Sequence, residues 1–368
     1  MRPRAPAVKV RPRVQFQKRR KMATTSQTFP IRSAPDSPEV ASAPALSIPG
    51  LFTSQPILRD PLETSTSRIQ DETVKECLPY LRGNSTRLDY NRHGVPTLTR
   101  EKHKNFLKNL RKLPAPYIAA DASRPWMLLW NLAGLALLDE DISAYGPVLV
   151  DTAHTMQNKS GGFGGGHGQT SHLATTFACV LALSCCGTQE AYDVIDRRSM
   201  WKWLCSLKQP NGGFQITYGG EVDVRGAYCA AVIITLLNIP IGLSPDSPAW
   251  TPERPTLFTG LAEYVRRWCL SILDAPHRII PKPSDSYHTY YVLAGLSSAQ
   301  HNWQLKEDPS VLDSATGQPS LSWTVSPTVP GEQIFDEKDR LLATHPIYTV
   351  PQQKVDAIME YFASKPGF

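Results

Sequence analysis

The sequence predicts an all-α fold in which buried helices alternate with amphipathic ones, and three observations support this prediction. First, the stretch 161–180, GGFGGGHGQTSHLATTFACV, leads from a glycine-dense turn into a segment without Asp, Glu, Lys or Arg. This is the pattern of a helix that is buried on every side. Second, the turn Gly161-Gly162-Phe163 recurs 51 positions later as Gly212-Gly213-Phe214, as expected for an array of helical hairpins. Third, few stretches show the alternation typical of strands.

The first part of the chain differs in composition from the rest. Nine basic residues and no acidic one fall within the first 21 of the 368 positions. Such a run fits a nuclear signal, a nucleic-acid-binding arm or a mitochondrial presequence. We interpret it instead as a disordered leader, or as the result of an upstream start codon with Met22 as the working start, and we expect no nucleic-acid partner. Residues 1–65 are rich in Pro, Ser and Arg, and we expect this tail to be disordered. Residues 66–368 are expected to form the folded domain.

Cysteine usage and hydropathy indicate a reduced, cytoplasmic protein. The seven cysteines form no Cys-x-x-Cys pair, and no signal peptide is recognisable, so we expect free thiols. The longest apolar run, Trp126–Leu138, is interrupted by Asn131 and is typical of a core helix rather than a membrane span.

Hydrophobic periodicity and capping residues predict the helices in order. They cover 66–81, 99–113, 126–138, 139–157, the segment after 171, 189–207, 222–237, 257–270, a helix that starts near 287, and 352–363. Ser171 is the expected N-cap of the helix after the first glycine turn. We expect a loop at 296–351. In the last helix, one face is predicted to carry Val355, Ile358, Met359 and Phe362.

Polar and aromatic residues stand at the starts of four of the apolar helices. If these helices form an inner ring and run parallel, their starts share one rim, where backbone N–H groups favour anions. The rim residues are Ser123 and Trp126; His172 and Ala174; Glu221, Arg225 and Tyr228; and Tyr287 and His288. Each alone is most simply a helix cap or a core group, but their convergence predicts a functional rim.

Four motifs, GGFGGGHGQTSHLA, GGEVDVRGAYCAA, DASRPW and DSYHTYYVLAGLSSAQH, resemble the β subunits of fungal protein farnesyltransferases. The resemblance extends from about Ile48 to Phe368. It implies an α/α barrel (toroid) of the prenyltransferase and terpene-cyclase type. It also implies a β subunit that transfers farnesyl from farnesyl diphosphate to the cysteine of a C-terminal Cys-aliphatic-aliphatic-X motif. Such a subunit forms a heterodimer with a helical-repeat α subunit.

The same resemblance assigns roles to the rim residues. The isoprenoid channel is expected to be lined by Trp126, Arg225 and Tyr228. The peptide is expected to contact Ser123, Trp126, Trp130, His172, Ala174, Glu221, Arg225 and Tyr287. Within this set, His172, Glu221 and Arg225 would engage the peptide terminus through water, as suits a carboxylate. The bulk of Trp126 implies a channel too shallow for a twenty-carbon chain, although a hydrophobic staple at the helix start also explains this residue.

His288 matches a ligand of the family's catalytic zinc, which makes the substrate thiol a thiolate and needs three protein ligands. The other two lie in an Asp-x-Cys motif, which occurs nowhere in the 368 residues. The resemblance breaks off near 268–281, where the family has further helical hairpins with its diphosphate-binding cluster. We therefore expect an incomplete barrel that binds no zinc and is inactive as written, because of a skipped exon or a faulty gene model.

Three rival functions remain open at this point. A truncated isoform that only binds the α subunit or a peptide is favoured by the missing Asp-x-Cys motif. The β subunit of a geranylgeranyl-transferring relative is disfavoured by Trp126. A terpene cyclase is disfavoured because the sequence has no acidic, Asp-rich motif.

Overall fold

The computed structural model describes residues 63–81, 88–109, 120–272, 285–312, 319–328, 333 and 335–365. All of them belong to one compact unit, Leu46–Phe368. The helices are α2 Ser65–Leu81, α3 Arg100–Asn109, α4 Arg124–Leu137, α5 Gly146–Met156, α6 Leu173–Cys186, α7 Gln189–Asp193, α8 Arg197–Leu207, α9 Val224–Leu236, α10 Leu261–Ile272, α11 Ser286–Ala299 and α12 Gln352–Ser364. Short 3₁₀ helices lie at Ser143–Tyr145 and Glu337–Asp339, and two strands, β1 His301–Leu312 and β2 Pro319–Pro327, form a ribbon.

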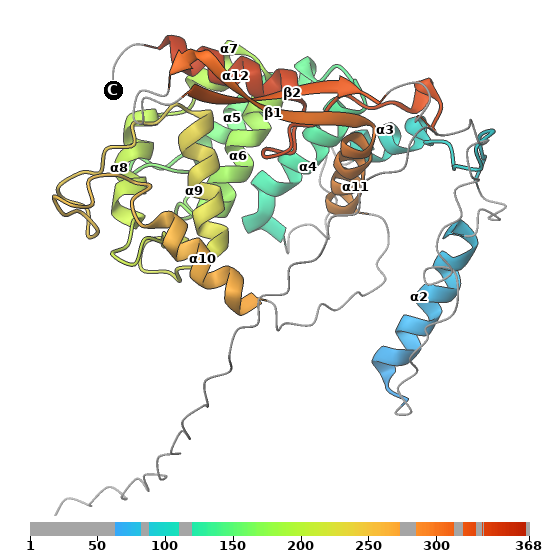
Figure 1. Cartoon of the computed structure of the whole chain (residues 1–368), viewed down its shortest axis with the longest axis horizontal. Coiled ribbons are helices and arrows are strands. Elements are labelled where there is room, and N and C mark those ends of the chain that lie inside the picture. Colours follow the sequence, from blue (N-terminus) through green and yellow to red (C-terminus); the bar gives the residue numbers. More distant parts are fainter. Residues whose placement is uncertain are drawn as a thin grey trace, which may run out of the picture. The chain divides into compact units, whose positions relative to one another are not determined.

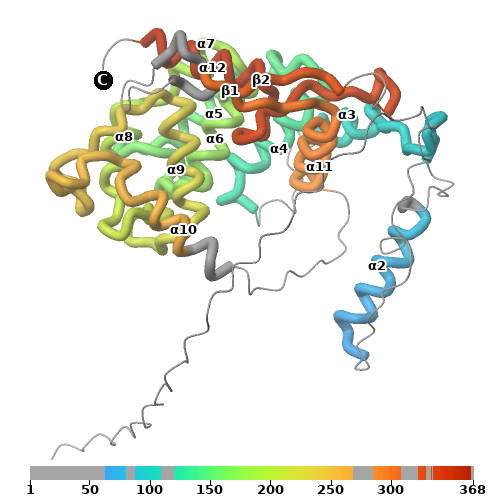
Figure 2. Tube along the Cα trace, in the orientation of Figure 1, coloured from blue at the N-terminus to red at the C-terminus, as the bar shows by residue number. Residues whose placement is uncertain are grey.

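Four helices stand side by side in the order α11, α4, α6, α9, and each packs against the next (Figures 1 and 2). Other helices cover this row: α3 packs on α4, α5 on α6, α10 on α9, and α12 on both α6 and α9. The predicted alternation of buried and outer helices along the chain is thereby confirmed.

Burial follows the two classes of helix. Every residue of α6 except Ala174 is buried. In the outer helix α8, by contrast, only one side is buried, and it includes Met200, Trp203 and Leu204. A helix without a polar face is stable in water only when neighbours surround it, so the sequence of α6 requires the layer of helices around it.

The repeated glycine turn has the same structure in both copies. Gly161 and Gly212 have φ values of 100° and 94°. A Cβ on either would lie within 2.1 Å of the backbone oxygen of Ser199 or Gly260, respectively, so each turn packs closely against the chain at the next outer helix. The turns close through the pairs Gln157–Phe163 and Lys208–Phe214. Lys208 therefore occupies the position in the second turn that Gln157 occupies in the first.

The segment 345–350 is hydrogen-bonded to both α9 and α11. The hydroxyl of Tyr228, on α9, donates to the carbonyl oxygen of Ile347 (2.5 Å). The hydroxyl of Tyr290, on α11, donates to the carbonyl oxygen of Thr349 (2.7 Å). Tyr348 also donates to Thr235 Oγ1 on α9 (2.9 Å). These bonds connect the two ends of the inner row.

Several predicted helix boundaries differ from the structure. The helix expected at 139–157 begins only at Gly146, because Asp139 adopts a left-handed φ of 58° and ends α4. The helix expected at 189–207 is divided into α7 and α8, and Asp196 caps the second. The N-cap of α6 is His172 instead of Ser171, whose hydroxyl donates to Gly161 O (2.6 Å).

The segment 296–351, which was expected to be a loop, contains the antiparallel ribbon β1–β2. Trp303 lies opposite Val325, and Leu305 lies opposite Trp323, so apolar side chains share one face of the ribbon. On α12, Val355, Ile358 and Phe362 are buried as predicted, but Met359 is 39% exposed, so the buried face is narrower than predicted.

Some predictions fall outside the described residues. These include the tail up to residue 62 and most of the interruption near 268–281, while α2 already begins at Ser65. In the described part of the chain, six cysteines are free thiols. No helix there combines the length and apolar character needed to cross a membrane.

Candidate functional site

A row of aromatic rings crosses the starts of all four inner helices. Tyr228 on α9 contacts Phe177 on α6 (centroids 5.5 Å apart), and Phe177 contacts Trp126 on α4 (5.8 Å). Trp126 contacts Trp130 (5.7 Å), which in turn meets Tyr287 on α11 edge to face (5.2 Å). Tyr228 and Tyr287, at the two ends, are 45% and 44% exposed. We call these five rings the aromatic row.

The aromatic row establishes the geometry that the sequence predicted for the rim. Trp126, Phe177, Tyr228 and Tyr287 all lie within the first five residues of their helices. Their rings can meet only if the four helices begin at the same end of the bundle. The structure thus brings together Trp126, Trp130, Tyr228 and Tyr287 from the predicted site.

A polar group adjoins the Tyr228 end of the row. The exposed guanidinium of Arg225 is paired with Asp223 (2.5 Å) and Glu221 (3.6 Å). The bond from Asp223 raises the pKa of Arg225. His172 lies within the electrostatic influence of all three groups, so the predicted residues His172, Glu221 and Arg225 form one cluster.

His172 is held as a neutral imidazole with a defined tautomer. As the N-cap of α6, its Nδ1 accepts a hydrogen bond from the backbone N–H of Ala174 (3.1 Å). An accepting Nδ1 carries no proton, so the proton of the ring is on Nε2. Burial, the largest effect, lowers the pKa of His172. The side chain therefore offers an N–H donor to the rim.

Ser123 and Ala174 lie at the starts of α4 and α6. Ser123 occupies the N-cap position of α4 but makes no capping hydrogen bond with its side chain. The two helix starts pack closely at Gly165, in the turn before α6. A Cβ on this residue would lie 2.1 Å from Ala122 O, so only glycine fits here. Gln169 Nε2 also donates to Asp121 Oδ2 (3.3 Å). Ala174 is the one residue of α6 that is not buried.

His288 lies at the other end of the aromatic row, with its ring against that of Tyr287 (4.8 Å). Its Nδ1 is 2.8 Å from Oδ2 of Asp285, the N-cap of α11. Because a carboxylate can only accept, Nδ1 carries a proton and donates it to Asp285, so that Nε2 is the ring nitrogen not bonded to Asp285. A carboxylate in this position is the usual partner of a metal-ligating histidine. Within the described ranges, however, no group of three or more possible metal ligands is present.

The sequence did not identify three residues of this site. Phe177 is the central ring of the aromatic row; it lies one turn after Ala174, a spacing that indicates a shared helix face. Asp223 and Asp285 hold Arg225 and His288, two and three residues further along the chain. Each of these aspartates stands immediately before an apolar helix, which is the sequence pattern of an N-cap.

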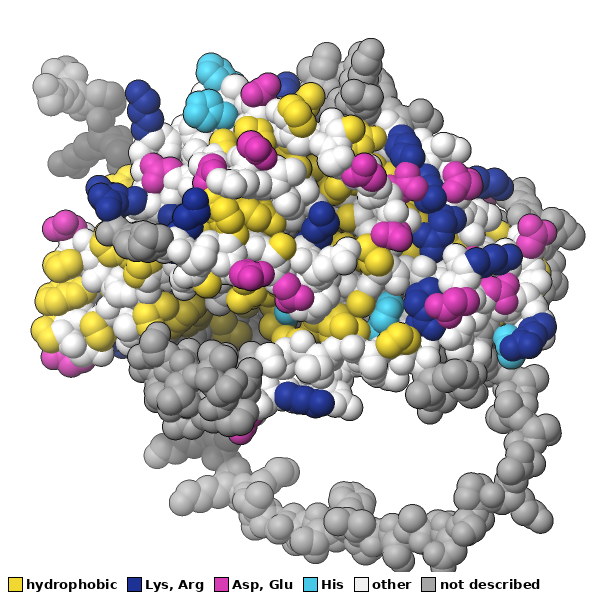
Figure 3. Space-filling view, turned by 90° about the horizontal axis from the view of Figure 1, so that it is seen from above, with side chains coloured by type: hydrophobic (Ala, Val, Ile, Leu, Met, Phe, Trp, Pro, Cys, Tyr) yellow, Lys and Arg dark blue, Asp and Glu magenta, His cyan; other side chains and the backbone are white. Residues whose placement is uncertain are grey.

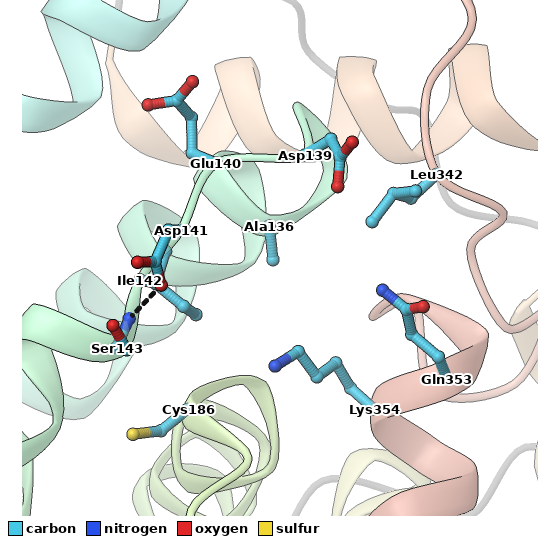
Figure 4. A pocket seen from close by; sticks show the side chains of 10 residues that line it. All are labelled: Ala136, Asp139, Glu140, Asp141, Ile142, Ser143, Cys186, Leu342, Gln353 and Lys354. Atoms are coloured by element: carbon cyan, nitrogen blue, oxygen red, sulfur yellow. Dashed lines mark hydrogen bonds between the residues drawn. The ribbon is translucent and has the colours of Figure 1, made fainter.

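A polar cavity of about 290 Å³ lies at the opposite ends of α4 and α6 and contains none of the predicted site residues (Figure 4). Lys354 extends into it, toward Cys186 and Asp141 (Figure 4). Lys354 Nζ lies beside the C-terminus of α6, only 2.8 Å from where a Cβ on the C-cap residue Gly187 would be. A cation there complements the helix dipole, so we interpret Lys354 as structural.

On the face shown in Figure 3, acidic and basic side chains are interspersed.

Comparison with known proteins places this geometry in a family. The family model of the prenyltransferase alpha-alpha toroid domain matches residues 98–271 and 262–350. The β subunit of protein farnesyltransferase from Pyricularia oryzae is 41% identical over 455 positions, covering 89% of this chain and 87% of that protein. The corresponding subunits of Saccharomyces cerevisiae and Schizosaccharomyces pombe are 41% and 36% identical. The chain spans less than half of these two relatives, namely 42% and 45%.

A solved structure of Candida albicans protein geranylgeranyltransferase-I complexed with GGPP aligns with a TM-score of 0.44 at 14% identity, over 72% of this chain and 99% of that chain. The alignment with the Pyricularia protein contains gaps on the side of this chain. Its 455 positions include 89% of the 368 residues, or about 328, so about 127 positions of the alignment have no residue of this chain opposite them.

Proposed function

The chain belongs to the protein farnesyltransferase β-subunit family of prenyltransferase α/α toroids, and on this premise we propose that it serves as the β subunit of a protein farnesyltransferase. The reaction joins farnesyl diphosphate to the cysteine of a C-terminal Cys-aliphatic-aliphatic-X motif. The C1–O bond of the diphosphate breaks and a C1–S bond forms, while inorganic diphosphate leaves and the thiol proton passes to solvent. The aromatic row is the observation that carries the proposal.

The aromatic row suits an isoprenoid and an aliphatic peptide. Five rings in continuous contact present an apolar strip that ends in the half-exposed Tyr228 and Tyr287. Burial of a fifteen-carbon chain on such a strip contributes about 25 cal/mol per Å² of apolar surface. The Nε2–H of His172 and the guanidinium of Arg225 lie beside the Tyr228 end, where they would bind the anionic end of a ligand. We assign Trp126, Arg225 and Tyr228 to the isoprenoid. The residues assigned to the peptide are Ser123, Trp126, Trp130, His172, Ala174, Glu221, Arg225 and Tyr287, so Trp126 and Arg225 contact both ligands.

The metal site of the family is only partly represented. His288, whose Nε2 is not bonded to Asp285, fits one zinc ligand, and Asp285 fits its orienting partner. Catalytic zinc sites use three protein ligands. The described residues contain no group of three possible ligands, and the full sequence has no Asp-x-Cys motif. The residues present therefore do not fit the zinc site, and transfer would depend on ligands that this chain lacks.

The incomplete metal site favours a second candidate, a protein that binds the α subunit or a peptide without transferring farnesyl. The two overlapping matches to the toroid, which meet at 262–271, and the roughly 127 unmatched alignment positions support a missing central segment. In either case we propose a heterodimer with a farnesyltransferase α subunit in the cytoplasm.

The proposal is tested by binding of a fluorescent anthraniloyl analogue of farnesyl diphosphate to the full chain co-expressed with the α subunit. Energy transfer from tryptophan should be saturable and reversed by farnesyl diphosphate. Tyr228→Ala should weaken binding about tenfold because a contact ring is lost. Tyr218→Ala is the matched control, since this side chain is 82% exposed and lies outside the aromatic row. Absence of saturable binding, or equal losses in both variants, would refute the proposal.

A further inference from the structure

Asp223 has an unusually complete set of contacts for a residue outside the predicted site. It is the N-cap of α9, and its Oδ1 accepts from the backbone N–H groups of Arg225 (2.7 Å) and Gly226 (3.2 Å). Its Oδ2 accepts from Nε (3.0 Å) and Nη2 (2.5 Å) of the Arg225 side chain. Burial is the largest single effect on the pKa of Asp223 and raises it. The bonds from Arg225 and Gly226 together outweigh burial, so the pKa lies below its usual value and the carboxylate is ionised.

The two oxygens have separable roles. Capping needs only Oδ1, and asparagine serves as well as aspartate there. The second oxygen, Oδ2, accepts hydrogen bonds from two N–H groups of the Arg225 guanidinium. The Asp223 side chain is only 16% exposed, whereas that of Arg225 is 73% exposed. An ion pair this exposed adds little to stability, but its forked geometry fixes the direction of the guanidinium.

We propose that Asp223 is a positioning residue that aims Arg225 at the C-terminal carboxylate of the peptide; this inference rests on the proposed function. Nε and Nη2 are directed to Asp223, so Nη1 is the part of the fork that remains to face a ligand. Nearby, His172 presents Nε2–H. Both donors are therefore fixed by capping residues of adjacent inner helices, α6 and α9.

The negative charge of Asp223 also repels a ligand carboxylate, so the relative size of the two effects matters. Ordering a long, flexible side chain in advance is worth about tenfold in affinity. Repulsion between carboxylates several ångströms apart in water is worth about twofold to threefold. Positioning should therefore exceed repulsion, and removal of the charge at Asp223 should weaken binding of the carboxylate.

The test is a double-mutant cycle between the protein and its ligand. The full chain, co-expressed with the α subunit, is titrated with a fluorescent Cys-aliphatic-aliphatic-X peptide that ends in a carboxylate or in an amide, with farnesyl diphosphate present. Asp223→Asn keeps the capping oxygen but removes the second acceptor oxygen, which binds the guanidinium. It should raise the Kd of the carboxylate peptide about tenfold and that of the amide less than twofold. In an Arg225→Ala background it should have no further effect.

Asp196→Asn, at the N-cap of the outer helix α8, controls for a general effect of this substitution at a cap and should leave both peptides unaffected. Equal weakening of both peptides in Asp223→Asn would mean a structural role, and unchanged or tighter binding would mean that repulsion dominates; either result overturns the positioning role. If the unaltered protein binds neither peptide, the proposed peptide-binding function itself is refuted, and the positioning role with it.

Discussion

His345 makes stability depend on pH in the segment that connects α9 and α11. The imidazole is 6% exposed, and its Nδ1 accepts from the backbone N–H groups of Ile347 (3.1 Å) and Tyr348 (3.4 Å). Burial lowers the pKa of His345 from 6.5 to about 4. The folded state thus binds this proton less readily than the unfolded state. The stabilisation is complete above pH 6.5 and is lost as the pH falls toward 4.

The size of the effect follows from the two pKa values. Between pH 7.5 and pH 4.5 the linkage amounts to about 2–3 kcal/mol of unfolding free energy. His345→Asn should remove it, because the amide oxygen can accept both backbone bonds and does not titrate in this range. Loss of the ring contact with Tyr348 (4.5 Å) should cost the variant about 1 kcal/mol at either pH.

The assay is urea unfolding of the full chain and of His345→Asn at both pH values. The carboxylates titrate in both proteins, so only the difference between them reports His345. On acidification, we expect the unfolding free energy of the variant to fall about 2–3 kcal/mol less than that of the unaltered chain. The same pH dependence in both proteins would show that His345 is not held neutral by burial.

Three further predictions concern the aromatic row and the tail. Phe177→Ala should destabilise the fold by about 3–5 kcal/mol and abolish binding of the farnesyl diphosphate analogue, whereas Phe177→Leu should cost about 1 kcal/mol; equal urea midpoints would contradict a central packing role. With the family's central segment restored, Trp126→Thr should admit geranylgeranyl diphosphate because ring volume is removed, and unchanged discrimination in a transfer assay would count against this. Deletion of residues 1–21 should leave the Tm unaltered, and a drop of several degrees would show that the tail packs on the domain.

The sequence predicted the inner helices well because their signal is local. A segment such as α6, without charge on any face, can only be buried, and repeated glycine turns delimit the helices on either side. The shared rim followed from the same pattern, since parallel inner helices must begin at the same end. The positions of Trp126, Trp130, Tyr228 and Tyr287 accordingly agree with the sequence analysis, and their roles remain proposals.

The features that escaped prediction depend on contacts between distant residues. The ribbon β1–β2 forms because Trp303 and Leu305 meet Val325 and Trp323 across the strands, while Asp308-Pro309 obscures the local strand signal. The bonds from Tyr228 and Tyr290 to the segment 345–350 span more than fifty residues. No periodicity within a single segment records such a contact.

Asp223 and Asp285 show a different limit. Aspartate before an apolar helix is a common N-cap, and this pattern predicts only what one of its two oxygens binds. In the folded chain the second oxygen binds the side chain of Arg225 in one case and of His288 in the other.

The central claim, that the chain carries the ligand-binding rim of a farnesyltransferase β subunit without its complete metal site, is tested most directly by one paired measurement. The full chain, co-expressed with its α subunit, is assayed for zinc by atomic absorption and for farnesyl transfer to a Cys-aliphatic-aliphatic-X peptide. His288 alone cannot retain the metal, so we predict no stoichiometric zinc and no transfer, and recovery of both when the family's central segment is inserted. One zinc per chain together with turnover in the chain as written would contradict the account.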